Sequence, residues 1–404
     1  MTPPEQMCVT QPAQPTRLDP VLINSCPPRL GIPIDVVLGV IDEASTNYTT
    51  LRSCCLVNRT ISSYAQALLF RSVRLESYRH FVAYSRAVCP STARGRLLGE
   101  LARSLSLSCE HVVVLQQYDR LALRDIAKLL PSVPKLRHLE LFLRGTLDLL
   151  PDDLQVFSRA KSITSLHLHN HTKFGQTVVH DILTALPQIT KLWLSGSAFK
   201  IVTGREPLGL TLSELHWHIS LEPSALELKW LLGESSALES FSVDIPQENR
   251  STTFSERLLQ LVLQRYGANL HSLRLSDRVN SLGFVDVACP ELSELLLRFW
   301  PTPEVLGTLP HELTHLGLAR PDETIANEPA LHELMTSLSD LSKLRTLSWL
   351  DRNGVSTNER TELRKFCHAR GIAVREHDCG AETQSMFPRR TFGSPIRRWI
   401  TMPD

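Results

Sequence analysis

Residues 136–141 of the 404-residue chain are LRHLEL, and the same spacing of leucines returns at 270–275 (LHSLRL), 292–297 (LSELLL) and 313–318 (LTHLGL). Looser copies, with Ile, Phe, Val or Trp replacing a leucine, start at 163, 189, 212, 238 and 344. Successive copies begin 21 to 32 residues apart. A unit repeated at such a period indicates a solenoid, in which each repeat packs against its neighbours.

This period is near the ~20–29 residues of a leucine-rich repeat. Apolar residues at helical spacing lie between the copies, for example in 254–266 and 331–341. Strands joined by helices stack in parallel. We therefore expect an α/β fold, an irregular leucine-rich-repeat solenoid of parallel strands and helices, preceded by a small helical unit. The unequal gaps predict an uneven arc.

Changes of pattern along the chain predict its domain boundaries. We expect a flexible lead-in, a helical domain, a transitional or N-terminal capping region, the repeats, a C-terminal cap with an edge strand near 372–374, and a flexible basic tail. These segments are 1–27, 28–75, 76–120, 121–350, 351–376 and 377–404. The arginine pairs of the tail fit a solvated segment, or else a short import signal or a patch for an acidic partner.

Composition excludes several classes of function. The net charge of +1 gives no general attraction to nucleic acid or to an acidic membrane. No apolar run approaches the ~18 residues of a membrane helix, and the Pro-rich start lacks the pattern of a secretory signal. The nine scattered cysteines fit reduced thiols in the cytoplasm or nucleus.

The segment before the repeats differs from them. Residues 32–35 (IPID) open a helix, since Pro33 suits a first turn and Asp35 complements the positive end of the helix dipole. Apolar residues follow at helical spacing, and residues 56–61 are LVNRTI. A helical unit of under ~50 residues rarely stabilises itself alone, so we expect it to lean on a partner or on the repeats.

This segment resembles an F-box. The family opens with Leu-Pro-x-Glu, which residues 32–35 match conservatively, and continues with Leu-Val-Cys-Arg/Lys-x-Trp, which residues 56–61 match at Leu56, Val57 and Arg59. Asn58 replaces the Cys and Ile61 replaces the Trp. The resemblance implies a substrate-recognition adaptor that binds a Skp-type adaptor, and through it the cullin scaffold of a ubiquitin ligase. It implies an apolar adaptor face, for which packing inside the unit is the other explanation. That face comprises Pro33, Ile34, Val37, Leu38, Ile41, Leu56 and Val57.

The repeats would select the substrate protein. In each copy the two close leucines point inward and their neighbours point outward, onto an exposed ridge. Interface cores favour Trp, Tyr and Arg, so an outward Trp beside His and Arg suits protein recognition. We expect the substrate to be bound by Trp193, His216, Arg274 and Arg298.

Clustered histidines raise the question of a metal. His167, His169 and His171 alternate, and two such histidines share a face of a strand and can ligate zinc. No Cys, Asp or Glu at matching spacing completes a site, so we expect no metal and no cofactor. No nucleophile elbow, phosphate loop or kinase signature is present, which favours a non-catalytic adaptor over an enzyme. A repeat scaffold that binds protein without any ligase is the alternative.

Overall fold

The computed structural model describes residues 32–109, 121–145, 147, 149–172, 177–199, 207–219, 224–233, 237–244, 256–276, 279–320, 331–351 and 357–377. The chain divides into two compact units, Met1–Leu69 and Phe70–Asp404. The expected lead-in 1–27 and all but the first residue of the tail 377–404 lie outside the described residues. No helix among the described residues is long and apolar enough to cross a membrane.

The smaller unit is helical. It contains α1 (Ile34–Glu43), a 3-10 turn η1 (Ala44–Thr46), α2 (Tyr48–Cys54) and α3 (Arg59–Arg71), whose last turn extends past the boundary. Asparagine side chains start two of the helices: Asn47 accepts from the backbone N–H of Thr50, and Asn58 from that of Ile61. Only a tight turn therefore separates α1 from α2.

The core of the smaller unit is small. Its buried members are Ile41, Leu51, Ile61 and Ala65. The Tyr64 hydroxyl donates a 2.7 Å hydrogen bond to the Asp42 carboxylate, which ties α3 to the end of α1. Such a core leaves much of the unit's apolar surface in solvent.

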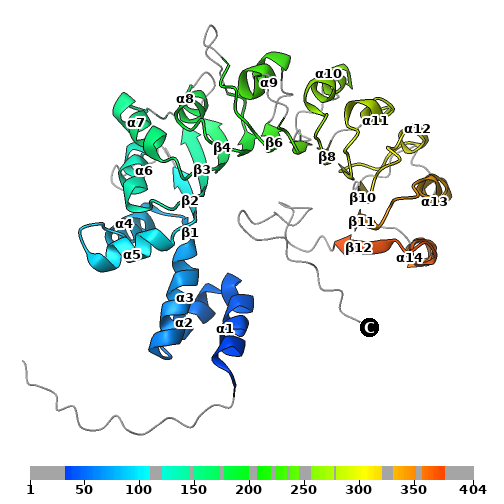
Figure 1. The fold of residues 1–404 in the computed structure, drawn as a ribbon. Coiled ribbons are helices and arrows are strands. Elements are labelled where there is room, and N and C mark those ends of the chain that lie inside the picture. The colour runs from blue at the N-terminus through cyan, green and yellow to red at the C-terminus, as the bar shows by residue number, and fades with distance from the viewer. Residues whose placement is uncertain are drawn as a thin grey trace, which may run out of the picture. The chain divides into compact units, whose positions relative to one another are not determined.

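The larger unit contains one sheet of twelve parallel strands in sequence order. The strands are β1 (Ser72–Leu75), β2 (Ser104–Cys109), β3 (His138–Gly145), β4 (Ser165–Thr172), β5 (Lys191–Gly196), β6 (Glu214–Ile219), β7 (Ser240–Val243), β8 (Ser272–Leu275), β9 (Glu294–Leu297), β10 (His315–Arg320), β11 (Thr346–Asp351) and β12 (Ala373–His377). Within this unit the strands lie along the inner side of a curved array and the helices along its outer side (Figure 1). The predicted α/β class with parallel strands and helices is confirmed.

Helices connect most of the successive strands. They are α4 (Tyr78–Ala87), α5 (Ala93–Leu101), α6 (Leu123–Leu129) followed by the 3-10 turn η2 (Leu130–Ser132), α7 (Pro151–Arg159), α8 (Val178–Ala185), α9 (Ala225–Leu232), α10 (Glu256–Tyr266), α11 (Val285–Ala288), α12 (Pro303–Leu306), α13 (Leu331–Asp340) and α14 (Thr357–Ala369). A capping box starts α9, where Ser224 and Glu227 exchange backbone and side-chain hydrogen bonds, and Gly233 with φ of 59° ends it.

The leucines of the repeated motif form the core of this unit. Leu139 and Leu141 on β3, like Leu273 and Leu275 on β8, are buried with apolar residues of the outer helices. The sheet begins earlier than the leucine pattern suggests, because β1 and β2 pair in register before residue 121. The expected edge strand near residues 372–374 is β12, which closes the strand order.

Candidate functional site

The register of the strands places equivalent residues side by side on the face of the sheet that is turned away from the helices. Since side chains alternate along a strand, residues two apart share this face. We call the central set of partners the middle row. Across β2 to β8 it comprises Ser106, Glu140, His167, Trp193, His216, Ser242 and Arg274.

A continuous stack of rings crosses β3 to β6 on this face. Ring centroids are 3.8 Å apart for Phe142 and His169, 3.9 Å for His169 and His167, 4.9 Å for His167 and Trp193, and 4.2 Å for Trp193 and His216. Strands lie about 4.8 Å apart, so flat side chains at equivalent positions of neighbouring strands come into ring contact. The Phe142–His169 and Trp193–His216 pairs are stacked, and the two pairs that include His167 are tilted. We call these five residues the ring stack.

Stacking changes the exposure expected for these positions. His167 is only 5% exposed and His216 9%, while Trp193 is half-buried. The expectation of an exposed ridge is therefore wrong at His216, and His167 on the same face is buried as well. Each ring covers its neighbour on the adjacent strand, an effect that alternation along a single strand does not include.

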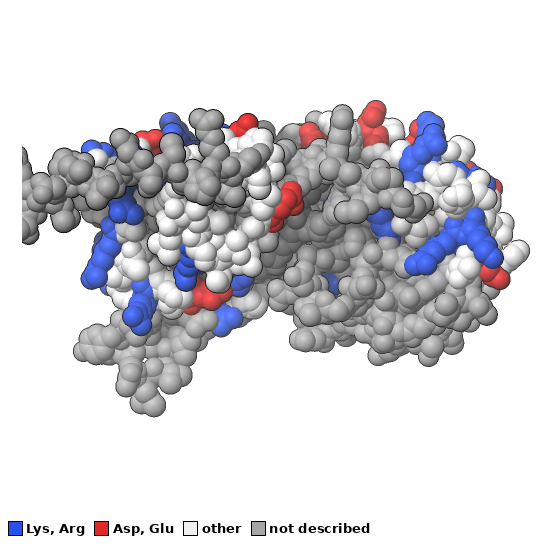
Figure 2. All heavy atoms as spheres, turned by 90° about the horizontal axis from the view of Figure 1, so that it is seen from below, with Lys and Arg blue, Asp and Glu red and all other residues white. Residues whose placement is uncertain are grey.

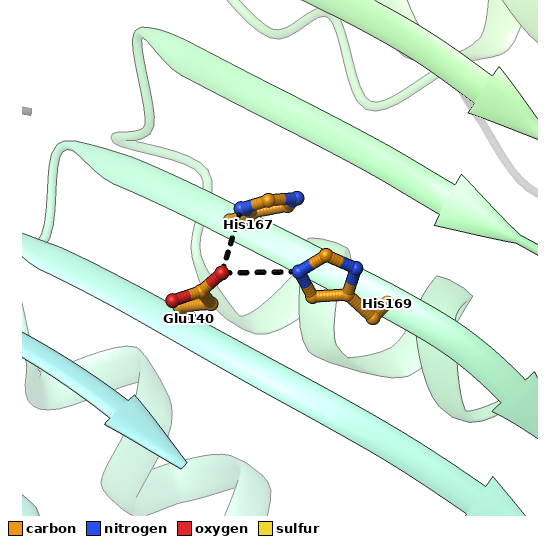
Figure 3. Close-up of side chains that lie close together, drawn as sticks. All are labelled: Glu140, His167 and His169. Carbon is orange, nitrogen blue, oxygen red and sulfur yellow. Dashed lines mark hydrogen bonds and ion pairs between the residues drawn. The ribbon is translucent and has the colours of Figure 1, made fainter. Parts of the chain in front are cut away.

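The carboxylate of Glu140 contacts two rings of the ring stack. Its Oε1 lies 3.1 Å from His167 Nδ1 and 3.0 Å from His169 Nε2 (Figure 3). Burial opposes ionisation of Glu140, but hydrogen bonds from His167, His169 and Ser106 outweigh it and hold the pKa of the carboxyl well below its usual range. Glu140 is therefore an anion on a partly buried face. We call a carboxylate on this face that contacts histidine or arginine side chains an acidic junction, and Glu140 forms the first one.

A second acidic junction lies at Asp244, directly after β7. Its carboxylate meets His218 Nδ1 at 2.8 Å and the guanidinium of Arg298. Burial raises the pKa of Asp244, but the hydrogen bond from His218 and the charge of Arg298 lower it overall. Arg298 is therefore held in an ion pair across the sheet.

A third acidic junction surrounds Glu294 on β9. Arg274 Nη2 and the Ser272 hydroxyl reach its Oε1 at 3.2 and 2.6 Å, and His315 Nδ1 lies 2.9 Å from Oε2. Against the effect of burial, the His315 hydrogen bond and the Arg274 charge lower the pKa of Glu294 to about 2. The other ring nitrogen of His315 lies 2.8 Å from the Ser348 hydroxyl, which extends the network to β11.

The four expected substrate-binding residues thus divide into three groups. Trp193 and His216 contact each other in the ring stack, whereas Arg274 and Arg298 belong to separate acidic junctions. Sequence reasoning missed Phe142, Ser195 and Asp244, which lie two residues beyond the middle row. Extending the repeated motif by two residues and aligning the copies would have found them.

The apolar residues expected on the adaptor face of the smaller unit also fall into two groups, one exposed and one packed in the core. Pro33, Ile34, Leu56 and Val57 are exposed. Ile41 is buried, and Val37 and Leu38 pack against the same core, so these three side chains stabilise the unit. Two exposed valines of α1, Val36 and Val40, were not anticipated.

Comparisons with known proteins do not indicate what either of these surfaces binds. No protein-family model matches the chain, and no curated protein sequence matches it. A crystal structure of a Bacteroides fragilis protein is similar over 76% of this chain and 74% of its own, with 12% sequence identity and a TM-score of 0.38.

Proposed function

We propose that the chain is the substrate-recognition adaptor of a Skp–cullin–F-box type ubiquitin ligase. The smaller unit would bind the Skp-type adaptor, and the polar face of the sheet would bind a substrate protein. Chemistry would belong to the recruited ubiquitin-transfer enzymes, while this chain contributes proximity. Five cysteines are free thiols, which supports a cytoplasmic or nuclear setting: Cys54, Cys55, Cys89, Cys289 and Cys367.

The exposed apolar surface of the smaller unit is the observation that carries this proposal. Leu56 is 88% exposed and Val57 63%. On α1, Val36 and Val40 are also exposed and lie four residues apart, so they share one side of the helix, and Ile32, just before α1, is exposed as well. Apolar groups concentrated on so small a unit indicate a surface that a partner covers.

The ring stack supports recognition of a protein by the larger unit. Trp193 is a rigid aromatic side chain held between two histidine rings, and its half-buried position leaves part of it available. Aromatic residues ordered in advance lose little entropy on binding. On the face in Figure 2, basic and acidic side chains of the described residues are both scattered among uncharged atoms. The net charge of +1 favours a protein over a nucleic acid or a membrane as the partner.

The position of Ile61 favours one alternative, a protein-binding scaffold without ligase association. Ile61 replaces the tryptophan of the F-box pattern, is 8% exposed and belongs to the core of its unit. It therefore offers no aromatic contact to an adaptor.

Capture of a purified Skp-type adaptor by the full-length chain tests the proposal. We compare the natural chain with the double variant Leu56→Asp/Val57→Asp, because two carboxylates on exposed positions disrupt an apolar interface without entering the core. Val287→Asp is the matched control, since Val287 is 87% exposed on α11 of the other unit. Circular dichroism verifies folding of all three.

We expect the double variant to retain less than a tenth of the captured adaptor and the control to retain all of it. No capture by the natural chain rules out the ligase function. If proximity labelling then still finds partners that depend on Trp193, the scaffold function replaces it.

A further inference from the structure

The strand register brings two histidines of β4 to a carboxylate of β3. Glu140 is the direct partner of His167 in the parallel pairing, and His169 lies two residues further along the same face. The repeat period thus supplies the acidic residue that the histidine strand itself lacks. Among the described residues these three offer ligand atoms within 4.8 Å of one another.

The donor atoms converge on one point. His167 Nδ1 and His169 Nε2 both aim at Glu140 Oε1, at 3.1 and 3.0 Å (Figure 3). Tetrahedral zinc with ligands at about 2.0–2.1 Å separates its donor atoms by about 3.4 Å. The two nitrogen–oxygen separations therefore lie within about 0.4 Å of the spacing that the ion requires, and all three ligand atoms lie within 4.8 Å of one another.

Surrounding groups hold the donors in the orientation that a metal needs. The Ser195 hydroxyl lies 2.7 Å from His169 Nδ1, which leaves Nε2 as the nitrogen toward Glu140. The Phe142 ring stacks on His169 at an interplanar angle of 8°, and Ser106 hydrogen-bonds the carboxylate. Such outer contacts fix ring orientation and tautomer in metal sites.

The other two acidic junctions provide a contrast. Asp244 and Glu294 each meet one histidine and one arginine, and a guanidinium cannot act as a ligand. Glu140 instead meets two imidazoles, and all three groups are common ligands of zinc. The carboxylate side chain is 23% exposed, so the cluster is open to solvent on one side.

We propose that His167 Nδ1, His169 Nε2 and a carboxylate oxygen of Glu140 bind one divalent transition-metal ion of the Zn²⁺ type. Three protein ligands leave one position for water or for a side chain of a bound protein. The proposal replaces the expectation that no acidic residue completes a site, and it does not depend on association with a ligase.

Zinc titration of the full-length, chelator-treated chain by isothermal calorimetry tests the site. We expect one Zn²⁺ per chain at this site, weakened at least 100-fold in His169→Ala and in Glu140→Gln. The matched control is His218→Ala, which removes a histidine of the same face at the Asp244 junction and should bind Zn²⁺ as the natural chain does. Ser195→Ala, which removes a positioning contact, should weaken binding about 10-fold.

The visible absorption of bound Co²⁺ reports which atoms ligate the ion, and circular dichroism reports separately whether a variant is folded. We expect the visible bands of a four-coordinate Co²⁺ with nitrogen and oxygen donors, and loss of these bands in Glu140→Gln with unchanged circular dichroism. Absence of Zn²⁺ binding, equal affinity in the natural chain and in His169→Ala, or a thiolate-to-cobalt band that assigns the ion to cysteines would each overturn the proposal.

Discussion

At the scale of single residues, the polar face of the sheet shows why a side chain's neighbours across strands matter more than its neighbours along the chain. His138 on β3 is an example. Burial and the nearby charges of Lys191 and Arg137 lower its pKa to about 4. Neither its burial nor the proximity of Lys191, which lies 53 positions later, is visible in the sequence around residue 138.

The low pKa of His138 makes folding pH-dependent. The unfolded chain binds a proton at this histidine near pH 6.5, whereas the folded chain binds it only near pH 4, so this contribution to stability is complete above 6.5 and is lost as the pH falls toward 4. His138→Gln should flatten the pH dependence of the urea-unfolding free energy in this window by about 1–3 kcal/mol. The control is Val287→Gln, at an exposed position, which removes no titratable group and should leave the slope unaltered.

Trp193 gives a second prediction at this scale. Trp193→Ala removes its ring contacts with His167 and His216, and aromatic pairs contribute about 0.5–1.5 kcal/mol each beyond burial. We expect the unfolding free energy to fall by about 1–3 kcal/mol, measured by urea denaturation. Val287→Ala, at an exposed site, should change it by less than about 0.5 kcal/mol. Equal losses in both variants would show that the stack does not stabilise the sheet.

At the scale of elements, the sequence predicted what depends on local chemistry. The inward leucines were predicted from local spacing and are buried. The capping box at Ser224 and Glu227 and the end of α9 at Gly233 obey rules that are equally local. The strand β1 was attributed to the helical domain, because Val73 and Leu75 gain their partners only from β2, about 30 residues later. The convergence of Glu140 with His167 was missed for the same reason, since pairing between strands is not a local property.

The end of β5 provides the prediction for this scale. Gly196 has φ of 95°, and a Cβ there would lie 2.1 Å from the backbone oxygen of Asn170 on β4. Gly196→Ala should lower the unfolding free energy by more than about 2 kcal/mol, because both strain and the clash must be relieved. Gly39→Ala on α1 is the control, since nothing beyond its own stretch of helix lies within 4 Å of the added Cβ, and it should be neutral or stabilising. Thermal melts that shift equally for both variants would contradict the close approach.

At the scale of the larger unit, one sheet with strands in sequence order means that every interior repeat has two neighbours and each end has one. Stability in such arrays is approximately a sum of nearest-neighbour terms. We therefore expect amide hydrogen exchange to be slowest in β4 to β8 and faster in β1 and β12, measured by mass spectrometry on the full-length chain. Uniform protection from end to end would show that the sheet opens as one cooperative block instead.

The register of this sheet also determines the length of each row of equivalent residues and the order in which residue types follow one another along it. Twelve strands about 4.8 Å apart give each row a contour of about 50 Å, the reach of roughly 16 residues of extended peptide. Along that contour aromatic rings occupy β3 to β6, and the arginine-bearing junctions follow from β7 onward. The surface is therefore asymmetric from one end to the other. An elongated partner that places its apolar groups at one end and its charges at the other can bind in only one orientation. In the ligase function that we propose, this orientation would fix which of the partner's lysines are presented for modification.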